Sequence, residues 1–186
     1  VMKCEILSIG SELTSGQNLD TNSQWLSRRL AENGIAVGWH TTIADDFDMN
    51  LDAFRIATGR ARLILVTGGL GPTTDDVTTE AVASALGVSL ERDDASLDHI
   101  RRRFEKAGRA MTESNAKQAD FPEGAEVLPN PIGTAPGFSV RLGECRAFFM
   151  PGVPREMIRM FDDQVLPRIR SLAPRTNYQL RLRTFG

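Results

Sequence analysis

The sequence has few of the residues that build disulfide frameworks and zinc sites. Among its 186 residues are two cysteines, Cys4 and Cys145, and two histidines, His40 and His99. Two cysteines are too few for a disulfide framework, and neither stands in a Cys-x-x-Cys spacing. A His/Cys zinc cage is therefore excluded, and any bound metal ion must be held by oxygen ligands, as Mg²⁺ commonly is.

The sequence also lacks an excess of one charge and a long apolar run. Its 22 Lys and Arg residues nearly balance its 24 Asp and Glu residues. Without a dense basic run, a nucleic-acid partner is not expected, and a small-molecule partner is favoured. The apolar runs 63–66 and 148–150 are too short to span a bilayer, and the N-terminus has no signal-peptide pattern. We therefore expect a cytoplasmic protein that makes no membrane contact.

Segments typical of strands and helices alternate along the first half of the chain. Apolar runs at 4–9, 35–43 and 63–67 predict strands. Apolar residues at helical spacing predict helices at 21–33, at 48–58 and before Gly87. This alternation predicts an α/β fold of three layers, with a mostly parallel, doubly wound sheet and helices on both of its faces.

The second half has fewer regular patterns. We expect a helix at 93–106, a hairpin of 138–142 and 146–149, and a last helix from Pro154. The proline-rich stretch 121–137 is predicted to be one long loop.

The alternation of Tyr178, Leu180 and Leu182 predicts a strand near the end of the sequence, with no partner to pair with. We therefore assign one domain to residues 2–172. Residues 173–186 are interpreted as a linker and the start of a truncated following region.

Three loops after the predicted strands are rich in acidic residues. In an open α/β sheet, ligands bind outside the carboxyl ends of the strands, so these loops should face one crevice. The first loop spans 10–22, the second holds Asp45 and Asp46, and the third runs from Gly68 to Asp76. Up to six carboxylates are expected to point into one pocket: Glu12, Asp20, Asp45, Asp46, Asp75 and Asp76.

The third loop combines acidic residues with glycines, and this combination predicts a divalent ion. Gly68, Gly69 and Gly71 beside a helix start let a phosphate approach backbone N–H groups. A helix dipole contributes only about 0.3–1 kcal/mol, whereas a carboxylate roughly 4 Å from a phosphate charge costs about 4 kcal/mol at an effective dielectric constant of about 20. We therefore expect a divalent metal ion (Mg, Mn or Co) between the carboxylates and the phosphate.

Simpler interpretations of these residues stay open. The loop is neither a Walker A sequence nor a complete dinucleotide fingerprint, so neither a kinase nor a dehydrogenase follows. Asp76 or Thr78 is explained equally well as the N-cap of the next helix. Asp45 with Asp46 is also typical of a solvated turn, and Lys117 and Arg155 are typical of surface charges.

Six short motifs are spread along the chain: Gly10-Ser11-Glu12-Leu13, Asp20-Thr21-Asn22, Ala44-Asp45-Asp46, Gly68–Thr78, Asn130–Gly137 and Pro151–Met157. Together they resemble the N-terminal domain of CinA-like proteins. The glycine-rich motif with its paired aspartates is the most specific, and the resemblance covers roughly residues 2–172. Ser11 stands where the family often has aspartate, and Ala44 where it often has glycine.

The resemblance implies the molybdopterin-binding fold shared with MogA- and MoaB-like proteins. It implies that Asp45 and Asp76 are catalytic or position a metal ion, and that Asp75 and Glu12 are further metal ligands. It also implies a homo-oligomer, a trimer or a dimer. The residues expected to bind the nucleotide or pterin phosphate are Asn22, Gly68, Gly69, Gly71, Thr73, Gly133, Thr134, Pro151 and Gly152.

Three functions agree with these features. Our first hypothesis is divalent-metal-dependent hydrolysis of a nucleoside-diphosphate sugar such as ADP-ribose, with metal-bound water attacking the pyrophosphate. The second is a non-catalytic module that binds molybdopterin or a nucleotide. The third is adenylylation of molybdopterin, in which the same loops transfer AMP.

Overall fold

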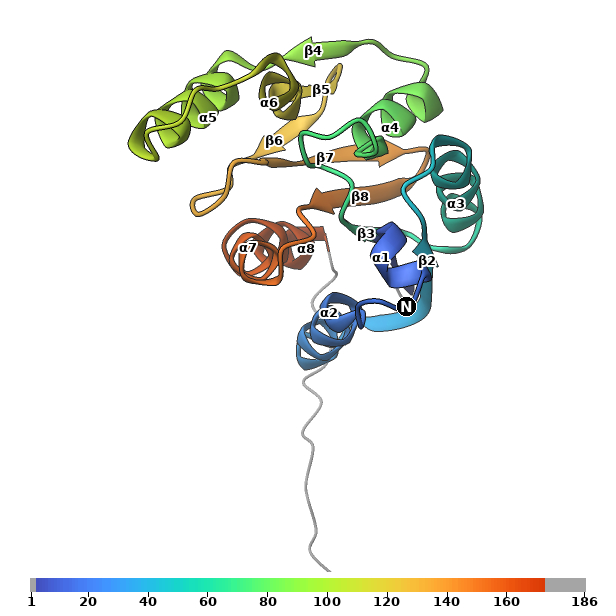
Figure 1. The fold of residues 1–186 in the computed structure, drawn as a ribbon. Coiled ribbons are helices and arrows are strands. Elements are labelled where there is room, and N and C mark those ends of the chain that lie inside the picture. The colour runs from blue at the N-terminus through green and yellow to red at the C-terminus, as the bar shows by residue number, and fades with distance from the viewer. Residues whose placement is uncertain (1–2, 173–186) are drawn as a thin grey trace, which may run out of the picture.

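A computed structural model describes residues 3–172 of the protein, which fold around a six-stranded sheet (Figure 1). The strand order is β2-β1-β3-β8-β7-β6. The first four strands in this order run parallel, and β7 and β6 continue the sheet in antiparallel pairing. The strands are β1 (Lys3–Ile9), β2 (Ala36–Ile43), β3 (Leu63–Thr67), β6 (Glu126–Leu128), β7 (Gly137–Leu142) and β8 (Cys145–Met150).

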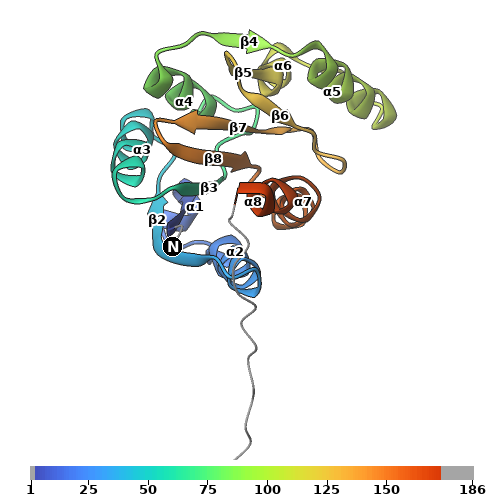
Figure 2. The same ribbon diagram turned by 180° about the vertical axis from the view of Figure 1, so that it is seen from behind.

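Helices cover both faces of the sheet, as the alternating pattern predicts (Figures 1 and 2). Successive residues of β1 point to opposite faces, because side chains alternate along a strand. Leu7 and Ile9 belong to a core cluster with α3 and α4, whereas Cys4 and Ile6 belong to one with α2, α7 and α8. The predicted three-layer α/β fold is confirmed. The helices are α2 (Thr21–Glu32), α3 (Phe47–Arg60), α4 (Thr78–Leu86), α7 (Pro154–Met160) and α8 (Leu166–Leu172).

The prediction of one long loop at 121–137 is wrong. This stretch contains β6 and part of β5 (Asp120–Pro122), which pairs with β4 (Leu90–Arg92) in a separate two-stranded sheet. Strands of three residues are too short to show an alternating pattern, and proline is tolerated at the edge of a sheet. The sequence pattern therefore could not reveal these strands.

A small lobe surrounds β4 and β5 at the far edge of the molecule (Figure 1). The predicted helix at 93–106 is present as α5 (Asp94–Lys106), and the carboxylate of Asp93 caps its N-terminus. It is followed by the short helix α6 (Glu113–Ala116) and the 3-10 turn η1 (Lys117–Ala119). This turn brings Lys117 against the loop that follows β3.

The last helical segment is continuous but not regular. Between α7 and α8 lies a wider π-type turn, η2 (Phe161–Val165). Pro167 follows it, has no N–H to donate to the preceding turn, and its ring would crowd the carbonyl of Asp163. The strand expected at 177–184 and the region expected at 173–186 lie outside the described residues. Within residues 3–172, we find no helix long and apolar enough to cross a membrane.

Candidate functional site

A cavity of about 470 Å³ opens where the parallel strands end. The loops after β1, β2, β3 and β8 all contribute to its wall, and so does the loop before the antiparallel strand β7. The predicted convergence of the loops on one sheet edge is therefore present. Nine predicted site residues line the cavity: Glu12, Asp45, Gly68, Gly69, Gly71, Asp76, Thr134, Pro151 and Gly152.

The glycine-rich loop depends on glycine for its shape. Gly68 and Gly69 have φ angles of 104° and 66°, a region that side chains disfavour. A Cβ atom on Gly68 would lie 2.0 Å from the carbonyl oxygen of Ile9, which is fixed backbone. The N–H of Gly68 donates to the carbonyl of Met150, so this group is already used. Within residues 3–172, no hydrogen bond uses the N–H of Gly69, Leu70 or Gly71.

Asp76 shapes the glycine-rich loop and does not cap a helix. Its carboxylate accepts hydrogen bonds from the backbone N–H of Thr73, at 2.9 Å, and from the Thr73 hydroxyl. The N-cap of α4 is Val77, and no side chain caps this helix. The hydroxyl of buried Thr78 instead donates to the Gly68 carbonyl at 3.4 Å. The alternative interpretation of Asp76 or Thr78 as an N-cap is therefore wrong.

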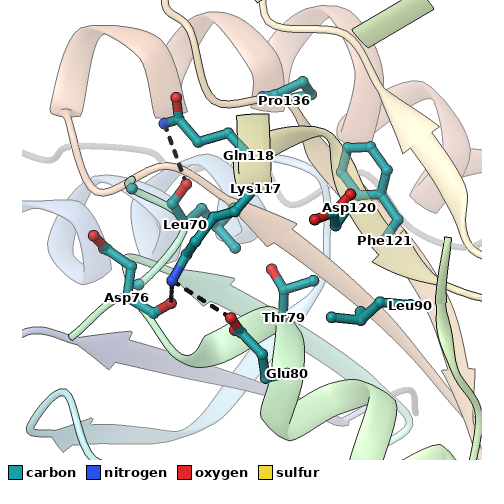
Figure 3. Close-up of a pocket in the computed structure, with 12 residues that line it drawn as sticks. Leu70, Asp76, Thr79, Glu80, Leu90, Lys117, Gln118, Asp120, Phe121 and Pro136 are labelled. Atoms are coloured by element: carbon teal, nitrogen blue, oxygen red, sulfur yellow. Dashed lines mark hydrogen bonds and ion pairs between the residues drawn. The ribbon is translucent and has the colours of Figure 1, made fainter. Parts of the chain in front are cut away.

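Lys117 lies beneath the glycine-rich loop and contacts it, although we expected this residue to be a surface charge. Its ammonium donates to the carbonyl oxygen of Asp76 at 2.8 Å and lies 3.4 Å from a carboxylate oxygen of Glu80 (Figure 3). It also donates to the carbonyl oxygen of Thr73 at 2.8 Å. One side chain of the small lobe thus holds the loop from below. No local pattern indicates this role, because the contact joins residues 41 positions apart.

Asp45 links the first two acidic loops. Its carboxylate accepts from the N–H of Ser11 at 2.8 Å, and the hydroxyl of Ser11 accepts from the N–H of Asp45 at 3.1 Å. Ser11 is therefore a hydrogen-bond partner of Asp45. Glu12 lies against Gly10, where a Cβ atom would be 2.7 Å from a Glu12 carboxylate oxygen.

The other three carboxylates of the predicted pocket do not line the main cavity. Asp20 caps α2 by accepting from the N–H of Ser23 at 3.0 Å, and Asp46 caps α3 by accepting from the N–H of Met49 at 2.8 Å. Burial by itself raises the pKa of Asp20, but hydrogen bonds from Ser23 and Ser8, together with the nearby His40, outweigh burial and lower that pKa below 3.8. Asp75 is exposed. The expected gathering of six carboxylates is thus reduced to Glu12, Asp45 and Asp76.

These three carboxylates do not form a metal site by themselves. Within residues 3–172, no group of three His, Cys, Asp or Glu side chains is arranged to hold a metal ion. Asp45 and Asp76 each use a carboxylate oxygen to accept backbone N–H groups. A divalent ion at this cavity would need further oxygen ligands from the bound molecule.

The loop between β6 and β7 is held by Asn130. Its amide nitrogen donates to the carbonyl of Ala135 at 2.9 Å and to the carboxylate of Glu156 at 2.8 Å. Its amide oxygen accepts from the N–H of Gly133 at 2.9 Å. Gly133 does not line the cavity, and a Cβ atom there would lie 2.0 Å from Glu156. Its role in the structure is to let the loop pack closely, which places Thr134 in the cavity wall.

Asn22 lies in a neighbouring cavity of about 370 Å³. Its amide nitrogen donates to the hydroxyl of Thr67 at 2.8 Å and to the carbonyl of Gly152 at 2.9 Å. The two cavities share Ile9, Glu12 and Gly152 in their walls. Of the remaining predicted site residues, Thr73 binds Asp76, and neither Thr73 nor Asp75 lines either cavity.

Comparison with known proteins identifies the family. Residues 5–171 match the family described as "Probable molybdopterin binding domain". A CinA-like protein of Anaeromyxobacter dehalogenans is 50% identical over 170 residues, which are 91% of this chain and 42% of that protein. The chain belongs to the molybdopterin-binding domain family, among its CinA-like members. It spans about two fifths of the length of such curated relatives.

Solved structures agree with this assignment. The protein CinA of Thermoplasma acidophilum, described as having unknown function, is 32% identical with a TM-score of 0.82, over 90% of this chain and 98% of that one. The molybdopterin biosynthesis enzyme MoaB of Thermus thermophilus is 20% identical with a TM-score of 0.60, over 92% of this chain and 96% of that one. The second likeness shows the fold alone, and that fold is the expected one.

The first functional hypothesis is wrong. The family match and the relatives indicate a CinA-like, molybdopterin-binding domain and not a pyrophosphatase that hydrolyses ADP-ribose. The hydrolase hypothesis depended on acidic side chains crowded around a dication. In the structure, three of the six carboxylates lie elsewhere and two of the others serve backbone N–H groups.

Proposed function

We propose that this domain binds a phosphorylated pterin or nucleotide, with the phosphate at the glycine-rich loop. One observation carries the proposal. In a loop that lines the cavity, the consecutive N–H groups of Gly69, Leu70 and Gly71 have no hydrogen-bond acceptor within residues 3–172. Successive backbone N–H groups in a turn are suited to bind a phosphate, and the glycines leave room for it.

The cavity suits a ligand of this class in size and chemistry. Its volume of about 470 Å³ lies within the range of about 300–1,000 Å³ typical of small-molecule sites. Leu70, Pro72 and Ala135 give it apolar wall surface, and Thr134 adds a hydroxyl group. A ring bound against the apolar wall with its phosphate at the loop would use both kinds of surface.

The binding experiment compares phosphorylated and unphosphorylated ligands. We expect neopterin phosphate and AMP to bind the purified domain at least tenfold more tightly than neopterin and adenosine, as measured by isothermal titration calorimetry. The Gly69→Ala variant should lose this preference, and Gly87→Ala, whose glycine lies at the end of α4, should keep it. Equal affinity for phosphorylated and unphosphorylated ligands would overturn the proposal.

A divalent ion remains part of the proposal as a companion of the phosphate. Glu12, Asp45 and Asp76 line the same cavity as the glycine-rich loop. Their charges oppose a phosphate unless a cation lies between them. Since these carboxylates form no three-ligand group, phosphate oxygens would complete the coordination of Mg, Mn or Co. Titrations with and without the ion test this point.

A second candidate function is transfer of AMP from ATP to molybdopterin. It is favoured by the two cavities of about 470 and 370 Å³, whose shared wall allows two ligands to bind side by side. Asp45 and Asp76 would then be the candidates to position the reacting phosphate. The test is incubation with ATP, Mg²⁺ and molybdopterin, with adenylylated molybdopterin and pyrophosphate as products. Binding of both ligands without product would leave the non-catalytic module as the function.

A further inference from the structure

A cavity of about 540 Å³, here called the α5 cavity, lies between α5 and the loop that joins β6 to β7. It shares no wall residue with the cavity at the glycine-rich loop. In both views of the fold, α5 lies at the outer edge of the small lobe, above this loop (Figures 1 and 2). The wall of the α5 cavity consists of His99, Arg102, Arg103, Lys106, Ala107 and Pro131.

The wall of the α5 cavity is basic. His99, Arg102, Arg103 and Lys106 follow one another at the spacing i, i+3, i+4 and i+7, so they share one face of the helix. The part of the wall that the structure describes contains no Asp or Glu. The positive charges that face this cavity are therefore not neutralised by an acidic residue of its wall.

Two of these side chains are held in place by the loop opposite. The guanidinium of Arg103 donates to the carbonyl oxygens of Pro131, at 3.4 Å, and Ile132. A guanidinium has five N–H donors, so further donors stay available for a ligand. Nε2 of His99 lies 3.1 Å from the carbonyl oxygen of Gly133, which can only accept, so this nitrogen is the donor. This side of the wall is thus formed before any ligand arrives, which lowers the entropy lost on binding.

Arg102 and Lys106 have no acidic partner. Arg101 pairs with Asp98, whereas neither Arg102 nor Lys106 forms an ion pair or a side-chain hydrogen bond within residues 3–172. Lys106 lies in the last turn of α5, where the negative end of the helix dipole favours a cation, but Arg102 lies before that turn. Like charges at i and i+4 destabilise a helix. The dipole therefore does not account for this row of charges, and an anion between them would.

We propose that the α5 cavity binds a diphosphate group and needs no divalent ion to do so. Arginine presents a fork of N–H donors that matches phosphate oxygens, and lysine adds a point charge. The cavity volume is within the range of about 300–1,000 Å³ typical of small-molecule sites. The charges from Arg102 to Lys106 extend over roughly 6 Å of helix axis, so two adjacent phosphate groups match this row better than one.

The test is isothermal titration calorimetry with inorganic pyrophosphate in the presence of EDTA. Removal of divalent ions disfavours phosphate at the glycine-rich loop, where carboxylates line the cavity, but not at the α5 cavity. We expect wild-type protein to bind pyrophosphate at least tenfold more tightly than inorganic phosphate, and less tightly as salt is added. A titration with ADP then shows whether free pyrophosphate or a nucleotide is the preferred source of the diphosphate.

A double variant shows whether binding takes place at α5. Arg102→Gln with Lys106→Gln should weaken pyrophosphate binding at least tenfold, because two of the cations of the wall are removed. The matched control, Arg28→Gln with Arg141→Gln, removes the same charge at exposed positions of α2 and β7. It should change the affinity by less than about twofold. Circular dichroism checks that both variants are folded.

The outcomes separate this inference from the proposed function. No binding of pyrophosphate by the wild type, or an affinity that survives in the α5 double variant, overturns the inference. An equal loss in the control variant also overturns it, because net charge then explains the binding. Gly69→Ala should leave pyrophosphate binding unchanged; if this variant alone abolishes it, the anion lies at the glycine-rich loop. Failure of the proposed function is detected independently, by the titrations with neopterin phosphate and AMP.

Discussion

The ammonium nitrogen of Lys117 lies 2.8 Å from the backbone carbonyl oxygen of Asp76, and this contact ties the small lobe to the glycine-rich loop. The same nitrogen binds the carbonyl of Thr73, so one side chain fixes both ends of the turn that the Asp76 carboxylate closes. The loop is therefore held from two sides before any ligand arrives. A preorganised loop loses less entropy on binding than a mobile one.

We predict that Lys117→Met lowers both stability and ligand affinity. The substitution removes two charge-assisted hydrogen bonds and the ion pair with Glu80, which is expected to cost about 2 kcal/mol. For a domain of this size the melting temperature should fall by about 4–8 °C. Calorimetric melting checks the effect. Lys106→Met, at the exposed end of α5, is the charge-matched control and should change stability by less than about 1 kcal/mol.

Two glycines with almost the same φ angle test whether Thr78 crowds the glycine-rich loop. Gly69 and Gly87 have φ angles of 66° and 67°. A Cβ atom on Gly69 would lie 1.9 Å from the hydroxyl of buried Thr78, whereas one on Gly87 would meet nothing within 4 Å. We expect Gly87→Ala to cost about 1 kcal/mol from backbone strain alone, and Gly69→Ala to cost about 1–3 kcal/mol more. Equal losses in chemical denaturation would contradict the crowding of Gly69 by Thr78.

Replacing Asp76 by Asn tests whether a cation accompanies the phosphate. The amide oxygen of Asn can still accept from the N–H of Thr73, so the loop should keep its shape. Without a divalent ion, removing one negative charge should tighten phosphate binding by about fivefold, for about 1 kcal/mol of relieved repulsion. With Mg²⁺ present the change should weaken binding instead. The same direction of change under both conditions, measured by calorimetric titration, would exclude Asp76 as a metal ligand.

Acid should remove the stabilisation that Asp20 gives to α2. The pKa of this carboxyl group is lower in the folded protein than its usual value of 3.8. Its contribution is therefore fully present above the unfolded pKa and is lost as the pH falls through the folded pKa. At pH 7, Asp20→Ala should cost about 1 kcal/mol, a typical value for an N-cap. The difference in unfolding free energy between wild type and variant, measured by urea titration, should shrink below about pH 4. If this difference is unchanged at about pH 2.5, the stabilisation does not come from the ionised carboxylate of Asp20.

Part of the candidate site was predictable because its residues come directly after strands in the sequence. Asp45 and the residues from Gly68 to Asp76 come directly after strands whose apolar runs are evident in the sequence. Parallel strands bring their carboxyl ends to one edge, so these loops had to meet. The caps formed by Asp20 and Asp46 also had a signal, since aspartate before a helical segment is a common N-cap.

Other parts of the site had no local signal. Thr134 and Glu156 reach the cavity through the hydrogen bonds of Asn130, and Gln118 reaches it from the small lobe. Lys117 contacts the glycine-rich loop from the same lobe. The two short strands β4 and β5 that support this lobe pair over about 30 residues of intervening chain. Such pairing depends on which segments the rest of the fold brings together.

The order of amino acids alone dictates the α/β class, the succession of the main strands and helices, and the edge at which a ligand should bind. Those features follow from apolar periodicity and glycine positions, which act over a few neighbouring residues. The task of each polar side chain is settled only when the chain has folded. Asp76 closes a turn and Asp20 caps a helix, because each role depends on partners that folding supplies and on the water that folding removes.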